Sequence, residues 1–237
     1  MEPFLPKNQP GARWVDDRRV ISDIFHVLKA GCRWGDCPAD YGPSTTIYNR
    51  FNRGPRRRFW LGLLEAPAGA GAVTRSTATD STYVKAQRFA FGGKGRAKDQ
   101  AIGLSRGGQT TKVHAPTDTI GRPFALILTA GNVSDIAVAP ALLARASKAR
   151  HVLGDKGYDA DSLRLFLRQA GAVLVIPGRV NRKRKIVCDK SRYRERHLIE
   201  NAFCRIKNFR RAATRYDKLA ANFLSAVALA CFLGYWL

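Results

Sequence analysis

Hydrophobic residues near the N-terminus recur at the three- and four-residue spacing of an amphipathic helix. In residues 16–30 they are Val20, Ile21, Ile24, Phe25, Val27 and Leu28, and this spacing predicts a helix. A second helix is predicted to begin at Ser44 and to reach Phe51. Because a segment with Gly and Pro, residues 31–43, joins the two, they form a small unit resembling a helix-turn-helix, although only a minority of such pairs read DNA.

Two sequence breaks follow this helical unit. Gly54-Pro55 is predicted to end the second helix, because proline lacks an amide donor and disfavours helix in the residue before it. Residues 66–71, with the sequence APAGAG, are predicted to form a linker, after which the pattern changes from helical to mixed. We therefore expect a helical domain over residues 1–70 and a second domain over residues 71–237.

The second domain mixes short strand patterns with helical ones. A first strand is predicted over residues 77–83 and a hairpin over 110–115 and 124–129, with the Gly-rich, basic segment 85–106 as a loop. Later elements are predicted at 134–146 (helix, capped by Ser134 or Asp135), 151–154 (strand), 160–170 (helix), 173–176 (strand) and 194–210 (amphipathic helix). The order β-β-β-α-β-α-β-α predicts an α/β fold.

The last stretch, Leu219–Leu237, is apolar enough to be weighed as a membrane span. Asn222, Ser225 and Gly234 interrupt it, and no polar flank follows. A buried core helix is therefore the favoured interpretation, and we expect no membrane partner.

The net charge of the chain indicates what kind of partner it binds. The 41 Lys and Arg residues exceed the 18 Asp and Glu residues, for a formal charge of +23 on 237 residues. Clustered cations bind phosphates by displacing condensed counterions, so nucleic acid is the first candidate partner. The alternative is a ribosome-associated or merely basic protein whose charge keeps it soluble.

The five cysteines form no Cys-x-x-Cys pair, which indicates a reducing compartment and no zinc ribbon. His26, Cys32 and Cys37 can be drawn as a metal site, but a fourth ligand is lacking and ordinary thiols are favoured. The N-terminus lacks the basic and apolar segments of a signal peptide, so we expect a cytoplasmic protein.

Three acids stand out in a chain so poor in them. Asp80 lies in the first predicted strand, and Asp155 directly follows the strand predicted at 151–154. Each can also be an ordinary turn or cap residue. On the predicted helix at 194–210 and the residue before it, Tyr193, Arg196, Glu200 and Lys207 fall within an arc of about 60°.

This polar stripe borders an apolar face made by Leu198, Ile199, Ala202, Phe203, Ile206 and Phe209. The helix is therefore expected to pack on the sheet and to bring Glu200 to the sheet edge. The alternative for Glu200 is a solvated partner of Arg196 at i,i+4, worth about 0.2–0.5 kcal/mol. Three carboxylates converging at a sheet edge suit two Mg²⁺ ions about 3.5–4 Å apart, which promote phosphoryl transfer.

These residues resemble a known family. The spacing Tyr193-x2-Arg196-x3-Glu200-x6-Lys207 matches the Tyr-Arg-Glu-Lys signature of bacterial insertion-sequence DDE transposases. Residues 80–82 (DST) and 154–159 (GDKGYD) resemble the two aspartate motifs of that family, and residues 128–135 (LTAGNVSD) resemble the segment between them. The likeness is greatest to the IS-five-like group, and it covers nearly the whole chain.

The resemblance implies a helical DNA-binding domain over residues 1–70 and, over residues 71–237, a catalytic domain with an RNase H-like mixed sheet flanked by helices. It implies Asp80, Asp155 and Glu200 as the catalytic, metal-binding triad for Mg²⁺ or Mn²⁺, with two ions. Tyr193, Arg196 and Lys207 would contact the terminal DNA. The activity would be hydrolysis of phosphodiesters at the ends of an insertion sequence and transfer of the freed 3′-hydroxyl into target DNA. Its partners would be the terminal inverted repeats and target DNA, bound by a homodimer or a higher oligomer.

Other features leave alternatives open. The basic segments 85–112 and 182–190 are candidate DNA clamps or solvated charge runs. Lys156 and Tyr158 either contact DNA beside Asp155 or shape the turn there. Gly54-Pro55 and the short N-terminal segment depart from the family pattern, so an inactive, DNA-binding remnant is the alternative to an active transposase. A host RNase H-like nuclease is a third hypothesis.

Overall fold

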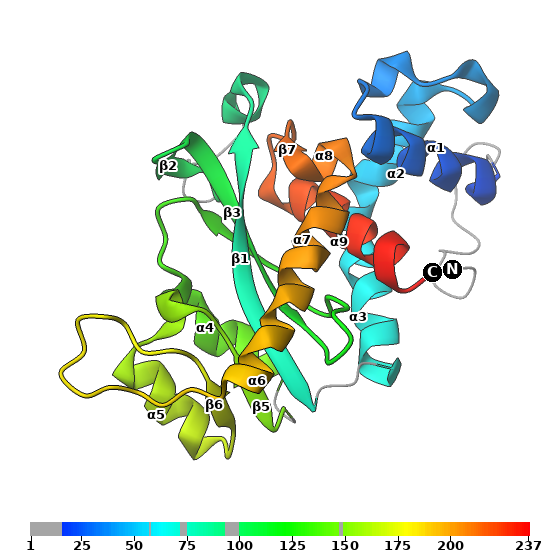
Figure 1. Ribbon diagram of the computed structural model, residues 1–237. Coiled ribbons are helices and arrows are strands. Elements are labelled where there is room, and N and C mark those ends of the chain that lie inside the picture. Colours follow the sequence, from blue (N-terminus) through cyan, green and yellow to red (C-terminus); the bar gives the residue numbers. More distant parts are fainter. Residues whose placement is uncertain (1–15, 57, 72–74, 93–99, 147–148) are drawn as a thin grey trace.

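The computed structural model describes residues 16–56, 58–71, 75–92, 100–146 and 149–237 (Figure 1). Its N-terminal part contains three helices, α1 (Asp17–Ala30), α2 (Ser44–Arg56) and α3 (Phe59–Gly71). Short 3₁₀ turns at Trp34–Asp36 and Ala39–Tyr41 lie between α1 and α2. The predicted first helix is confirmed: Asp16 accepts a hydrogen bond from the Arg18 amide (3.1 Å) at its start, and Gly31 ends it with φ +75°.

A mixed sheet forms the centre of the rest of the chain, in the order β2-β3-β1-β5-β6. The long strands β1 (Ser76–Ala86) and β3 (Gly108–Thr117) are antiparallel, whereas β5 (His151–Leu153) and β6 (Val173–Val175) continue the sheet in parallel from β1. Two short strands, β2 (Gly103–Ser105) and β4 (Ile127–Ala130), pair with the other edge of β3. The two-residue strand β7 (Thr214–Arg215) pairs with the end of β1.

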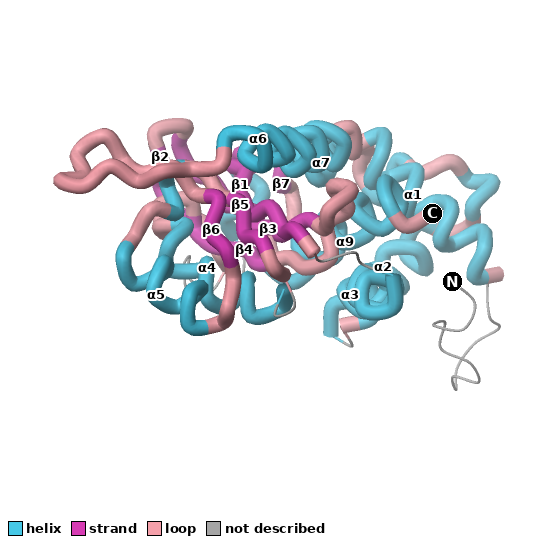
Figure 2. Tube along the Cα trace, turned by 60° about the horizontal axis from the view of Figure 1, so that its bottom comes forward, coloured by secondary structure: helices cyan, strands magenta, loops and turns pink. Residues whose placement is uncertain are grey.

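Helices cover both faces of the sheet (Figure 2). On one face lie α4 (Asp135–Leu143) and α5 (Asp161–Gln169), whose apolar side chains share a core with Val152 and Tyr158. On the other face lie α7 (His197–Lys207) and α9 (Ala220–Tyr235), which share a core with Leu153 of the same strand. The short helices α6 (Lys190–Tyr193) and α8 (Arg210–Ala213) flank α7. This arrangement confirms the expected α/β, RNase H-like fold with a helical N-terminal region.

The C-terminal helix α9 also packs against the N-terminal helices. Ala226, Leu229 and Phe232 of α9 form one apolar cluster with side chains of α1, α2 and α3, namely Val20, Ile24, Leu28, Ile47, Phe51, Trp60 and Leu63. The interpretation of the C-terminal stretch as a buried core helix is confirmed, and no described helix is long and apolar enough to cross a membrane. The division into domains at residue 70 stays a prediction.

Two predicted breaks in the N-terminal part are wrong. Helix α2 continues through Gly54-Pro55 to Arg56. Gly54 is buried against the indole of Trp60, which donates a hydrogen bond to the carbonyl of Phe51 (3.0 Å) and so joins α2 to α3. The predicted linker 66–71 is the last part of α3, which holds Pro67 inside the helix and packs on α9. Tertiary packing therefore overrides both local signals.

Two strand predictions also need correction. The strand expected at 124–129 begins only at Ile127, because Phe124, Ala125 and Leu126 are buried in an irregular segment. In the predicted loop 85–106, β1 extends to Ala86 by pairing with β7, and β2 forms a hairpin with β3. Residues 93–99 of that loop lie outside the described residues.

Candidate active site

Asp80 lies in the middle of β1, opposite Ala115 of β3. Its Oδ1 accepts a hydrogen bond from the Ser81 amide (2.7 Å), and its Oδ2 accepts one from Nη1 of Arg196 (2.8 Å). Burial raises the pKa of Asp80 to about 6, with the charges of Asp155 and Asp135 acting in the same direction. The Ser81 amide and Arg196 oppose this rise.

Arg196 joins Asp80 to Glu200. Its second terminal nitrogen, Nη2, donates to Oε1 of Glu200 one turn further along, and its guanidinium lies 5.8 Å from the ring centre of Tyr193. The predicted helix at 194–210 in fact starts at Lys190, capped by Asp189, and contains a 3₁₀ turn at Arg194–Arg196. The cap accounts for the earlier start, because the side chain of Asp189 accepts from two backbone amides, those of Ser191 and Arg192.

The two faces predicted for this helix are observed. Ile199, Ala202, Phe203 and Ile206 are buried against the sheet, and Leu198 and Phe209 are half-buried at the border. Lys207 is exposed at the far end of α7, two turns beyond Glu200. Of the predicted polar stripe, Arg196 contacts Asp80 on the sheet, whereas Lys207 faces solvent.

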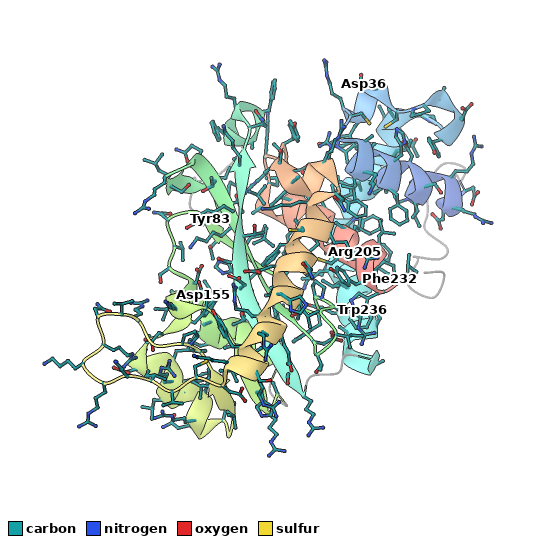
Figure 3. All side chains as sticks on the ribbon, viewed as in Figure 1. Asp36, Tyr83, Asp155, Arg205, Phe232 and Trp236 are labelled. Carbon is teal, nitrogen blue, oxygen red and sulfur yellow. The ribbon has the colours of Figure 1, made fainter. Side chains whose placement is uncertain are left out.

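Asp155 lies two residues after the end of β5 and caps the 3₁₀ turn Lys156–Tyr158 (Figure 3). Its Oδ1 accepts a hydrogen bond from the Gly157 amide (2.8 Å). A Cβ at position 157 would lie 2.8 Å from that same oxygen, so glycine lets the turn close on the carboxylate. No residue in the described part of the chain donates a hydrogen bond to Oδ2 of Asp155.

The three carboxylates do not form one cluster. Asp155 lies close enough to raise the pKa of Asp80, but Glu200 is 52% exposed and is held through Arg196. Among the described residues, no group of three or more His, Cys, Asp or Glu side chains is placed to hold a metal ion. The structure thus places Arg196 between Asp80 and Glu200, and it places Asp155 near enough to Asp80 for their charges to interact.

Asp80 and Asp155 nevertheless fit a hard divalent cation by their donor chemistry. Both are half-buried carboxylates, and each is fixed through Oδ1 by a backbone amide. Their mutual repulsion, which contributes to the raised pKa of Asp80, is a cost that a bound cation would relieve. In the present geometry, Arg196 supplies the positive charge next to Asp80.

A second polar cluster next to Asp80 was missed by the sequence interpretation. Oδ1 of Asp135, at the start of α4, accepts hydrogen bonds from Oγ of Ser81 (2.9 Å) and Nζ of Lys112 (2.9 Å). Lys112 also donates to the carbonyl of Val133 (2.8 Å) and is nearly buried. Although burial opposes it, Asp135 raises the pKa of Lys112, so this is a charged pair.

His114 completes this cluster as a neutral group. Its Nδ1 lies 3.7 Å from Asp135, its Nε2 hydrogen bonds with Oγ1 of Thr129 (2.8 Å), and burial lowers its pKa to about 4. Asp135 was predicted only as a possible helix cap. The available signal was an acid at the start of the helix after the hairpin, and only the fold brings it beside Ser81, 54 residues away.

For Lys156 and Tyr158, beside Asp155, the sequence left two interpretations: contact with DNA, or shaping of the turn. Tyr158 is 1% exposed and packs in the core with α4 and α5, which favours a role in shaping the turn over contact with DNA. Lys156 is exposed and remains a candidate contact. The five cysteines are free, and His26, Cys32 and Cys37, for which ordinary thiols were favoured over a metal site, form no metal-binding group among the described residues.

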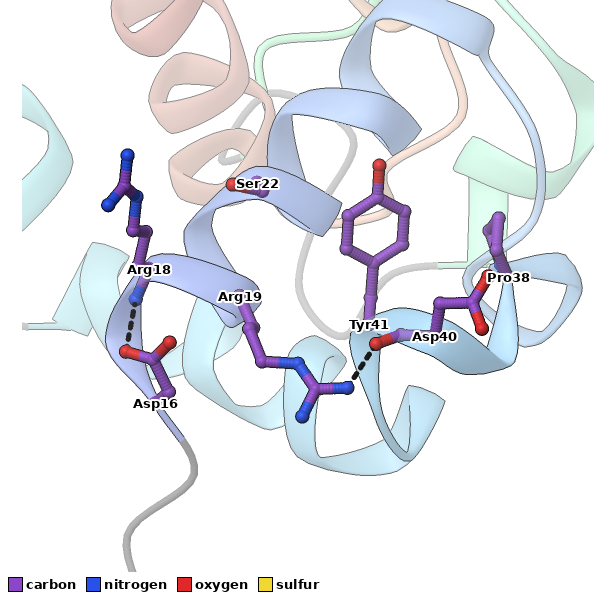
Figure 4. A pocket seen from close by; sticks show the side chains of 7 residues that line it. All are labelled: Asp16, Arg18, Arg19, Ser22, Pro38, Asp40 and Tyr41. Atoms are coloured by element: carbon purple, nitrogen blue, oxygen red, sulfur yellow. Dashed lines mark hydrogen bonds between the residues drawn. The ribbon is translucent and has the colours of Figure 1, made fainter.

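A hollow of about 530 Å³ lies elsewhere, between α1 and the turn Ala39–Tyr41 (Figure 4). Its lining carries both charges, from Asp16, Arg18, Arg19 and Asp40, and Arg19 donates a hydrogen bond to the carbonyl of Asp40. None of the predicted site residues lines it.

The family models and the relatives that match this chain all carry transposase names. Residues 72–234 match the family model "Transposase DDE domain", and residues 1–64 match the model "Putative transposase of IS4/5 family". A Brucella ovis protein, "Putative transposase for insertion sequence element IS6501", is 38% identical over 132 residues, which cover 54% of this chain and 98% of that protein. A Burkholderia cepacia protein, "Putative transposase for insertion sequence element IS402", is 28% identical over 186 residues, covering 70% of this chain and 86% of that protein.

Among solved structures, a pre-cleavage Mos1 transpososome aligns with 98% of this chain and 82% of its own chain. At 12% identity and a TM-score of 0.31, it is only distantly similar. The family model over residues 72–234 spans the sheet and both faces of helices, including Asp80, Asp155 and Glu200. This chain belongs to the transposase DDE domain family.

Proposed function

We propose that this chain cleaves DNA at the ends of an insertion sequence and joins the freed ends to target DNA. The observation that carries the proposal is the meeting of Asp80, Arg196 and Glu200 from β1 and the helical segment 190–207, with Asp155 acting on Asp80 from the end of β5. The protein has a formal charge of +23, and such an excess of cations suits the binding of phosphates. The acids of the candidate site are negative groups within this basic protein.

The reaction consists of two phosphoryl transfers. Water forms a bond to the phosphorus at the element's end, and the 3′-oxygen leaves as a hydroxyl. That hydroxyl then forms a bond to a phosphorus of the target strand, and one target phosphodiester breaks for each new one formed. The second step therefore needs no external energy source.

Asp80 and Asp155, with Glu200 as third ligand, would hold Mg²⁺ or Mn²⁺, two ions in the proposed mechanism. A cation bound there would lower the pKa of a bound water molecule and stabilise the leaving oxygen. The raised pKa of Asp80 supports this assignment, because a carboxylate destabilised by burial and by a second carboxylate gains from a cation.

The remaining stripe residues hold DNA in this proposal. Tyr193 and Lys207 contact the terminal inverted repeat, and Arg196 moves from the acids to a phosphate when DNA and cations are bound. Lys156, exposed beside Asp155, contacts the flanking phosphate. Because two ends have to be paired, a dimer or higher oligomer is the expected assembly.

The alternative of an inactive DNA-binding remnant was motivated in part by Gly54-Pro55. Since α2 runs through this dipeptide and Gly54 packs under Trp60, the dipeptide does not break the N-terminal helices. This supports an active protein, and the remnant becomes one outcome of the assay.

The test is a strand-transfer assay with a labelled duplex that carries the inverted repeat flanking the coding sequence, in the presence of Mg²⁺. Wild-type protein and the Glu195→Gln control, which changes an acid on the same segment, should form joined product. Asp155→Asn and Glu200→Gln should bind the duplex with unchanged affinity and form none. Binding without product by the wild type would instead identify a remnant, and equal cleavage of DNA lacking the repeat would favour a general nuclease.

A further inference from the structure

Residues 177–189, here named the basic arm, connect β6 to α6 without helix or strand. In Figure 1 the arm projects away from the sheet on the side of α5, and Figure 2 shows the same projection from another direction. It contains five cations, Arg179, Arg182, Lys183, Arg184 and Lys185, and a single acid, Asp189. Because its cations repel one another, the arm has to be held in position by contacts with other residues.

The root of the arm is fixed by Asp159, whose side chain is fully buried. Its Oδ1 accepts from Nε of Arg164 (2.7 Å), and its Oδ2 accepts from the Arg179 amide (2.7 Å) and from Nε of Arg182 (2.7 Å). Arg182 also pairs with Asp161 at the start of α5 (2.7 Å). Burial alone would raise the pKa of Asp159, but these donors hold it well below its usual value, so the anchor stays charged.

Arg179 ties this root to the turn that carries Asp155. Its Nε donates to the carbonyl of Lys156 (3.2 Å) and its Nη2 to the carbonyl of Gly157 (3.1 Å). The Gly157 amide in turn donates to Oδ1 of Asp155. The arm and the catalytic aspartate are thus built on one hydrogen-bonded turn.

The tip of the arm has no such partners. Lys183, Arg184 and Lys185 are exposed, and none of them forms an ion pair with another described residue. The valines on either side of the tip, Val180 and Val187, are 94% and 97% exposed. The root, built on a buried acid, thus holds cations and apolar side chains in solvent. This arrangement suits a partner that offers both phosphates and the C–H groups of deoxyribose.

We infer that the basic arm binds the DNA phosphate backbone and places it beside Asp155, an inference that rests on the proposed function. Lys183, Arg184 and Lys185 contact phosphates, and Val180 and Val187 contact the deoxyribose between them. Asp159 and Arg182 hold the arm, and Arg179 sets its position relative to Asp155. Because phosphate contacts carry no sequence information, the arm acts on any duplex.

The test is the salt dependence of duplex binding by the full chain, measured by fluorescence anisotropy. The variant K183Q/R184Q/K185Q removes three charges from the tip, and R145Q/R150Q/K218Q removes three exposed charges elsewhere. If three phosphate contacts are lost, the slope of log affinity against log salt should fall by about 3 for the tip variant. The control variant should keep the wild-type slope.

Trypsin digestion supplies a second readout that does not depend on activity. Without DNA, the exposed tip should be cut after Lys183, Arg184 or Lys185, and saturating duplex should protect these bonds. Equal slopes for the tip and control variants, or cleavage of the tip unchanged by DNA, would overturn the inference and leave a solvated charge run. Wild-type protein that binds no duplex at any salt concentration would contradict the proposed function itself.

Discussion

Nη1 of Arg196 lies 2.8 Å from Oδ2 of Asp80, although the two residues are 116 positions apart in the chain. The same guanidinium contacts Glu200, so one cation neutralises two of the three predicted catalytic acids. Such a contact is more than a surface ion pair, because both Arg196 and Asp80 are only 19% exposed. It places a protein cation beside the carboxylate that we propose as a ligand of a divalent cation.

Arg196 should therefore compete with a divalent cation for Asp80. Replacing it, Arg196→Gln, should tighten Mn²⁺ binding to the DNA-free protein several-fold, because Oδ2 of Asp80 loses its positive partner. Titration calorimetry or the paramagnetic effect of Mn²⁺ on water relaxation measures this affinity. Arg192→Gln removes a cation from the same segment, where it pairs with Asp189, and should have no such effect. Unchanged Mn²⁺ affinity in Arg196→Gln would refute the competition.

Asp80 should reduce the stability of the fold at neutral pH. Its folded pKa of about 6 lies above the ordinary value of 3.8, so the native state binds more protons than the unfolded state between these values. Stability should fall as the pH rises through this window and level off above it. Asp80→Asn should remove that loss and raise the free energy of unfolding by about 1–3 kcal/mol at pH 8, less whatever the lost pair with Arg196 contributes.

Urea unfolding at pH 4, 6 and 8 measures the effect. The advantage of Asp80→Asn over wild type should grow with pH. Asp36→Asn, which changes an exposed acid, controls for the change in net charge. A stability gain that is the same at all three pH values would contradict the raised pKa.

Lys112 and Asp135 should be strongly coupled in stability. Their side chains are 6% and 25% exposed, and truncation of one leaves a desolvated charge without its partner. Lys112→Met should cost about 3 kcal/mol, and adding Asp135→Asn should cost much less than the sum of the single changes. A double-mutant cycle by denaturant unfolding gives the coupling energy.

The matched pair for this cycle is Arg33 and Asp36, 3.7 Å apart and 91% and 59% exposed. Its coupling should stay below about 0.5 kcal/mol. If both cycles give equally small coupling energies, the Lys112 pair does not hold α4 against the sheet.

Gly54 should tolerate no side chain. A Cβ there would overlap the Trp60 indole, which is 2% exposed and cannot move without opening the α2–α3 corner. Gly54→Ala should lower the free energy of unfolding by about 2–4 kcal/mol through overpacking and loss of the indole hydrogen bond.

Gly62 in α3 is the control, because nothing lies within 4 Å of its would-be Cβ. Gly62→Ala should stabilise the protein by about 0.5–1 kcal/mol through helix propensity. Thermal unfolding of both variants distinguishes the two sites. A stabilising Gly54→Ala would show that the glycine is not needed for packing.

The sequence by itself determined the elements that depend on local periodicity. The spacing of Ile24 and Leu28 predicted α1, and the face of Ile199, Phe203 and Ile206 predicted how α7 packs, because burial along a helix repeats with the helix turn. The motif spacing around Arg196 and Glu200 was also readable, since one helical segment carries it. These features need only residues that are close in the chain.

Only the tertiary structure decided which residues meet across the chain. It extended β1 to Ala86 through β7, continued α2 past Gly54 because of Trp60, and placed Arg196 between Asp80 and Glu200. It also brought Asp135 to Lys112 and Asp159 to the root of the basic arm. Each of these contacts joins separate elements, and its energy depends on the path of the backbone between them, which local hydrophobic and polar patterns do not specify.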